Sequence, residues 1–106
     1  EQNWGPSQLE ASFRQAVDWA EAHGIPGRRL FMGEFGVILI SADGRMGAFD
    51  ADRLRYLEAV RQQAERLAIP WSVWEFANPH GMSLILPDGP PVADGGLVRA
   101  LGLASQ

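Results

Sequence analysis

The sequence predicts an α/β fold in which short parallel strands alternate with helices. Three segments have helical periodicity, and two short apolar runs rich in aromatic and branched residues lie between them. Neither run alternates regularly with polar residues, which is typical of strands covered on both faces. The order helix, strand, helix, strand, helix favours parallel strands joined by right-handed helical crossovers.

The first helix is predicted over residues 8–23. Its apolar side chains recur at helical spacing on one face: Leu9, Phe13, Ala16, Val17 and Ala20. Ser7 stands three residues before Glu10, the spacing of a capping box in which each side chain satisfies a free amide. Gly24 suits the left-handed conformation that ends many helices.

The two strands are predicted at residues 29–35, "RLFMGEF", and 70–76, "PWSVWEF". The helix between them is expected to begin at Asp50 as its cap, with a hydrophobic staple between Phe49 and Leu54, and to stop before Pro70. Its apolar stripe consists of Leu54, Leu57, Val60, Ala64 and Leu67.

A third, shorter helix is predicted after Asp94, which is expected to cap it. The side chains of Leu97, Val98 and Leu101 are then spaced to point inward. Between the second strand and this helix lies a segment of about twenty residues with little helical pattern, and loops of that length are usually functional or disordered. Within it, "MSLIL" followed by "PDGPP" suggests a hairpin over the ends of the strands.

Composition excludes several classes of function. The net charge is −4, and the nine basic residues, all arginine, are scattered along the chain, which argues against a nucleic-acid partner. There is no cysteine, and His23 and His80 lack metal-ligand spacing, so neither a disulfide nor a metal site is expected. No apolar run approaches the roughly 20 residues that cross a bilayer. No Gly-rich phosphate loop follows either strand.

Two parallel strands and three helices cannot complete a sheet, because each strand would keep an unpaired edge. The 106 residues are therefore expected to be one segment of a larger domain. Alone, such a piece buries too little surface to fold unless it associates with a partner or with itself.

The chemistry-bearing residues stand at the carboxyl ends of the two predicted strands, where α/β folds bind their ligands. Glu34 lies between two glycines in "MGEFG", and is either a functional carboxylate or a strand-end charge in water or in an ion pair. Trp74 offers an apolar face that can stack on a sugar ring, or is a core residue. Glu75 is a second carboxylate at the same end or an ion-pair partner. Asn78 and His80 follow on the loop as substrate contacts or as surface polar groups.

Three stretches, "RRLFMGEFGV", "DRLRYLEAVRQQAERLAIP" and "WSVWEFANPHGMSLI", together resemble the last part of glycoside hydrolase family 5, the cellulase-like (β/α)8 barrels. The later "HGMSLILPDG" and "GGLVRALG" agree with the same pattern. The resemblance covers nearly the whole chain. It implies the C-terminal part of a TIM barrel, from helix six to helix eight, incomplete as a lone chain, with residues 1–106 forming one segment of a single catalytic domain.

The family's strand-seven Glu, in a "GEFG"-type motif, is the catalytic nucleophile, so the resemblance implies that role for Glu34. It implies that Trp74 lines the sugar subsite at the cleavage point. Asn78 and His80 remain candidate substrate-binding residues because of their place on the loop beside the strand end. The activity implied is that of a retaining, endo-β-1,4-glucanase-like hydrolase that cleaves β-linked polysaccharides by double displacement. It needs no cofactor and no metal, and enzymes of this type are usually secreted.

The sequence departs from the family where the second catalytic group is concerned. The family's acid/base Glu lies in an Asn-Glu-Pro motif on strand four, and this tripeptide does not occur here. Glu75 is the only carboxylate near the strand ends besides Glu34, and the family gives it no such role. A barrel of this type needs about 250 residues. The chain alone is therefore expected to be inactive, with the missing N-terminal barrel part or a second copy as its partner. The alternative is a non-catalytic carbohydrate-binding or assembly module derived from the barrel.

Overall fold

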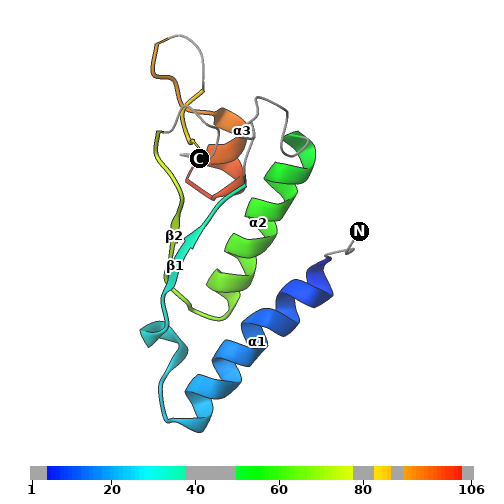
Figure 1. Cartoon of the computed structure of the whole chain (residues 1–106), viewed down its shortest axis with the longest axis vertical. Coiled ribbons are helices and arrows are strands. Elements are labelled where there is room, and N and C mark those ends of the chain that lie inside the picture. The colour runs from blue at the N-terminus through cyan, green and yellow to red at the C-terminus, as the bar shows by residue number, and fades with distance from the viewer. Residues whose placement is uncertain (1–4, 38–49, 78–82, 87–89, 104–106) are drawn as a thin grey trace, which may run out of the picture.

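The computed structural model describes residues 5–37, 50–77, 83–86 and 90–103, and the remaining positions lie outside this account (Figure 1). The chain forms, in order, helix α1 (Pro6–Ala22), a 3-10 turn η1 (Gly27–Arg29), strand β1 (Met32–Phe35), helix α2 (Asp50–Arg66), strand β2 (Trp71–Val73) and helix α3 (Gly95–Ala100). The predicted order of helices and strands is confirmed.

The strands β1 and β2 pair in parallel, as predicted, with α2 as the connection between them. They are shorter than the apolar runs that predicted them, because Arg29 belongs to η1 and β2 ends at Val73. One further main-chain bond continues the pairing, from the Trp74 amide to the Phe35 carbonyl at 2.8 Å. Among the described residues the sheet consists of these two strands.

The start of α1 differs from the prediction. Gly5 is its N-cap and Pro6 its first residue, where a proline loses no helical hydrogen bond. The Gln8 Oε1 atom accepts the Gly5 amide at 2.9 Å, so only one half of such a box is made, two residues before the predicted pair Ser7 and Glu10. The predicted capping box is therefore wrong.

The other helix ends agree more closely with the sequence. Gly24 follows α1 with a φ of 67°, the left-handed conformation that was expected there. Asp50 is the first residue of α2, and its predicted staple residue Phe49 lies outside the described residues. Asp94 caps α3 as predicted, because its Oδ1 atom accepts the Leu97 amide at 3.1 Å.

The helices cover one face of the sheet (Figure 1). Phe35 is 8% exposed and packs with side chains of α2 and α3, while Val17 of α1 packs near the C-terminal end of α2. The Phe35 and Trp71 rings meet edge to face at 5.5 Å. The buried positions come mostly from the predicted stripes: Val17, Ala20, Leu57, Val60, Ala64, Leu97 and Leu101.

A buried ion pair joins α2 to α3. Arg53 is 2% exposed, and its Nη2 atom lies 2.7 Å from Asp94 Oδ2. Burial alone would raise the pKa of Asp94, but the hydrogen bonds from the Leu97 amide and from Arg53 outweigh it and hold that pKa below its usual value. A second contact, from Arg61 Nε to the Ala100 carbonyl at 2.9 Å, fixes the end of α3.

In the segment before α3, antiparallel pairing of the predicted hairpin is present on either side of residues 87–89, which lie outside the described residues. Ile85 and Ala93 form an antiparallel bridge, and the Leu86 amide donates to the Val92 carbonyl at 2.8 Å. In the described part of the chain, no helix combines the length and apolarity needed to cross a membrane.

Candidate active site at the strand ends

Glu34 and Trp74, the two main candidates from the sequence, lie together at the carboxyl ends of β1 and β2. They line one open hollow of about 490 Å³ with Phe35 and Gly36, which we call the strand-end hollow. Neighbouring parallel strands end at the same edge of a sheet, which is why residues 40 positions apart meet here. The strand ends therefore bring a carboxylate and an exposed indole into one concavity.

The face of the sheet opposite the helices is bare in the described part of the chain. Gly33, Glu34, Ser72 and Trp74 are all exposed on it, and we call this the open face. The expectation that both faces of the strands are covered is thus met on one face only. Covering the second face takes the side chains of further strands, as in the interior of a closed barrel.

The carboxylate of Glu34 is exposed and forms neither an ion pair nor a side-chain hydrogen bond with the residues that the structure describes. A charge at the end of an apolar strand carries no large desolvation cost here, because water reaches the exposed carboxylate. Gly33, next to it, has no heavy atom within 4 Å of where a side chain would begin. Among the described residues, the space beside Gly33 is therefore open.

Trp74 is 48% exposed, so its indole is not a core residue, whereas Trp71 and Val73 of β2 pack against the core as predicted. The peptide bond between Trp74 and Glu75 is cis. Glu75 is partly buried, and its carbonyl accepts the Leu84 amide at 3.0 Å, so the hairpin holds the chain that leaves the strand. The predicted substrate contacts Asn78 and His80 lie outside the described residues.

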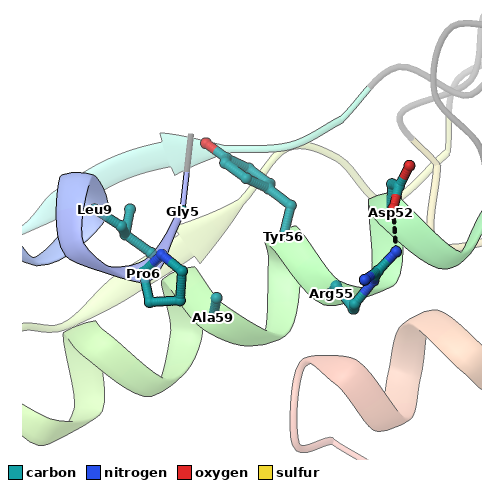
Figure 2. A pocket seen from close by; sticks show the side chains of 7 residues that line it. All are labelled: Gly5, Pro6, Leu9, Asp52, Arg55, Tyr56 and Ala59. Carbon is teal, nitrogen blue, oxygen red and sulfur yellow. Dashed lines mark hydrogen bonds and ion pairs between the residues drawn. The ribbon is translucent and has the colours of Figure 1, made fainter. Parts of the chain in front are cut away.

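A second hollow, which we call the helix groove, lies between α1 and α2 (Figure 2). It is lined by Gly5, Pro6, Leu9, Asp52, Arg55, Tyr56 and Ala59. Its one carboxylate, Asp52, is paired with Arg55, as the dashed line in Figure 2 marks. The rest of the lining is mostly apolar apart from the Tyr56 hydroxyl, and it holds no unpaired carboxylate, so the strand ends are the stronger candidate site.

Two structural roles were not singled out from the sequence, one at the site and one in the core. Ser72 lies opposite Glu34 and donates its hydroxyl to the Gly33 carbonyl at 2.5 Å. Arg53 carries a charge into the core, and its position four residues before Leu57 on the apolar stripe was the available signal. For Ser72 no sequence signal exists, because its role depends on how the two strands are paired.

The same fold occurs in solved glycoside hydrolases. A hyperthermophilic endo-β-1,4-glucanase, solved in complex with substrate, is 25% identical with a TM-score of 0.70, and the match covers 95% of this chain and 29% of that one. The cellulose synthase subunit Z of Clostridioides difficile is 26% identical with a TM-score of 0.75, covering 94% and 29%. A family 5 xyloglucanase of Paenibacillus pabuli is 23% identical with a TM-score of 0.66, covering 96% and 28%.

The chain spans less than a third of the length of these proteins. It has the α/β fold of their C-terminal part, which agrees with a fragment of a barrel. No protein-family model matches the sequence, and comparison with curated proteins also finds no match.

Proposed function

Because this chain is similar to the C-terminal segment of family 5 glycoside hydrolases over nearly its whole length, we propose that it belongs to a retaining hydrolase of β-linked glucans and supplies the nucleophile Glu34. The observation that carries the proposal is the strand-end hollow. It combines an exposed carboxylate with the half-exposed indole of Trp74 at the carboxyl ends of parallel strands.

In the proposed reaction, a carboxylate oxygen of Glu34 attacks the anomeric carbon while a second carboxyl group protonates the departing glycosidic oxygen. A covalent glycosyl ester forms on Glu34, and water activated by the same second group then releases the sugar. The two carboxyl groups of such a pair lie about 5–5.5 Å apart. No second carboxylate lines the strand-end hollow among the described residues. We therefore propose that a further part of a barrel, or another polypeptide, provides the acid/base.

Trp74 has a binding role in this proposal. Its indole face covers the C–H face of the sugar ring that Glu34 attacks, and excludes water from that side. Asn78 and His80, which follow it in the sequence, are proposed as hydrogen-bond partners of sugar hydroxyls. These two assignments rest on the sequence alone.

A β-linked glucan is the proposed substrate. The structural neighbours are endoglucanases and related proteins, and Thermotoga maritima structures among them are described in complex with cellobiose and with mannotriose. Those structures are 21% identical, so they support the fold, and the sugar class is inferred from the site. We further propose that the protein acts outside the cell, where polymeric glucans are found.

The test is hydrolysis of carboxymethylcellulose, followed by the release of reducing ends, with the protein in the assembly in which it is purified. Glu34→Gln keeps the shape of the side chain and removes the nucleophile, so we expect at least a roughly thousandfold loss of rate. Glu21→Gln, an equal charge change on the exposed surface of α1, is the control and should leave the rate unchanged.

Equal rates for wild type and Glu34→Gln contradict the proposed nucleophile. Binding of cellooligosaccharides with no hydrolysis in any assembly favours the alternative, a non-catalytic carbohydrate-binding or assembly module. The 106-residue chain without a partner is expected to show no rate, because it lacks the acid/base.

A further inference from the structure

The strand β1 contains a bulge at the position of the proposed nucleophile. Met32 is opposite Trp71 and Phe35 is opposite Val73, so the two residues Gly33 and Glu34 face the single residue between those partners, Ser72. Two residues opposite one is the defining count of a β-bulge, and bulges next to active sites re-aim a side chain.

The bulge decides which way Glu34 points. In a regular strand, side chains alternate between faces, so with Met32 on the helix side Glu34 would also point at the helices. Instead Gly33 and Glu34 are both exposed, and Phe35 returns to the core at 8% exposure. The extra residue therefore turns the Glu34 carboxylate toward the open face, while the Phe35 ring stays in the core.

We propose that Ser72 is the positioning residue for Glu34, because its hydroxyl holds the bulge that turns the carboxylate onto the open face. This inference rests on the proposed function and deepens it. A bulge leaves the main chain of its extra residue outside the regular ladder. The Ser72 hydroxyl donates to the Gly33 carbonyl, at 2.5 Å, and so ties the bulged peptide to β2 by a side chain.

Ser72 acts through Glu34, so its loss should slow the attack more than it weakens binding or folding. Within this chain the Ser72 side chain is exposed, so replacement by alanine removes no packing between the sheet and the helices. Ser72→Thr keeps the hydroxyl on a residue that strands favour. Ser12→Ala is the matched control, since Ser12 also donates its hydroxyl to a main-chain carbonyl, that of Gln8 at 3.1 Å on α1.

The first measurement follows the amide resonances of residues 33–35 by NMR in the assembly in which the protein is purified. Ser72→Ala should shift all three, Ser72→Thr should restore them, and Ser12→Ala should leave them in place. If Ser72→Ala leaves all three unchanged, the hydroxyl does not hold the bulge and the inference is wrong.

The second measurement uses 2,4-dinitrophenyl 2-deoxy-2-fluoro-β-cellobioside as the probe. The Glu34 carboxylate forms a bond to the anomeric carbon, the bond to the aryl oxygen breaks, and dinitrophenolate leaves with the electron pair. No general acid is needed, because this leaving group is stable as an anion. The burst of dinitrophenolate and the mass of the labelled peptide report the reaction at Glu34.

We expect Ser72→Ala to lower the labelling rate constant about tenfold, with the binding constant of the probe unchanged and with Ser72→Thr close to wild type. Equal rate constants for wild type and Ser72→Ala overturn the inference while the proposed nucleophile stands. If the wild type is not labelled at Glu34, the proposed function fails instead, and the NMR shifts still decide whether Ser72 holds the bulge.

Discussion

The two faces of the β1–β2 sheet differ in how far this chain completes them. The helix face carries Phe35 and Trp71, which pack against α1, α2 and α3 and exclude water. The open face carries Glu34, Ser72 and Trp74, all exposed. The chain's own helices complete the first face, and nothing described in the chain covers the second. The candidate site residues lie on the open face. The comparison therefore indicates that the helix face stabilises the fold, while the open face carries the candidate site.

The same division explains the exposed aromatic residues. Phe76 is 71% exposed and Trp74 is 48% exposed, although Trp71 and Val73 in the strand just before them pack against the core. Exposed apolar groups at an open sheet face and edge are typical of surfaces that another chain or another part of the same fold covers. The proposal that further strands complete the barrel accounts for both residues.

The largest expected effect is on the helix face. Leu57 is 2% exposed in the core under the sheet, so Leu57→Ala should lower the free energy of unfolding by about 3 kcal/mol. Phe76→Ala should lower it by less than Leu57→Ala does, because within the chain itself the Phe76 side chain is 71% exposed. Urea denaturation of the two variants measures both free energies of unfolding. A larger loss for Phe76→Ala than for Leu57→Ala would contradict the assignment of the stabilising core to the helix face.

The buried ion pair should give a smaller, pH-dependent effect. Asp94→Asn should cost about 2 kcal/mol, less than for a fully buried pair because the Asp94 side chain is 19% exposed. The folded-state pKa of Asp94 lies below its ordinary value of 3.8, so the unfolded chain binds more protons as the pH falls. The stabilisation is thus complete above about pH 4 and is lost as the pH falls through the folded-state pKa.

Urea midpoints of wild type and Asp94→Asn at pH 6 and at pH 3 test the sign. The difference between the two proteins should shrink at pH 3. A difference that grows on acidification would contradict the assigned role of the Arg53–Asp94 pair.

The smallest expected effect on stability belongs to Trp74. Because its indole is half exposed, Trp74→Ala should change the free energy of unfolding by less than about 0.5 kcal/mol while weakening oligosaccharide binding by about 1 kcal/mol. Trp71→Ala is the matched control, three residues earlier on the packed face, and should lose about 3 kcal/mol of stability. Thermal unfolding measures the stability of each variant, and isothermal titration with cellotetraose measures its oligosaccharide binding. Equal stability losses would show that the two tryptophans share one environment.

The sequence could predict the elements of this fold because their signals are local. Apolar spacing located the buried face of α2, Gly24 ended α1, and Asp94 capped α3. The strand-end position of Glu34 also followed from the sequence, since a parallel strand and its direction are enough to place its carboxyl end.

What escaped the sequence depends on pairing between distant segments. The bulge at Gly33–Glu34 exists only relative to β2, so no spacing within the run could reveal it or the bond from Ser72. The pairing of Arg53 with Asp94 joins residues 41 positions apart, and a charge on an apolar stripe has no local signature of its partner. The expectation of strands covered on both faces assumed a complete sheet, which the described residues do not form.

The central claim is that the open face is completed by other strands, and native mass spectrometry of the purified protein tests it most directly. We expect a mass above that of a single 106-residue chain, either as a complex with a larger polypeptide or as an assembly of copies. A species with the mass of one chain, which also melts cooperatively, would contradict the claim, because it would show that the open face and strand edges are stable in water.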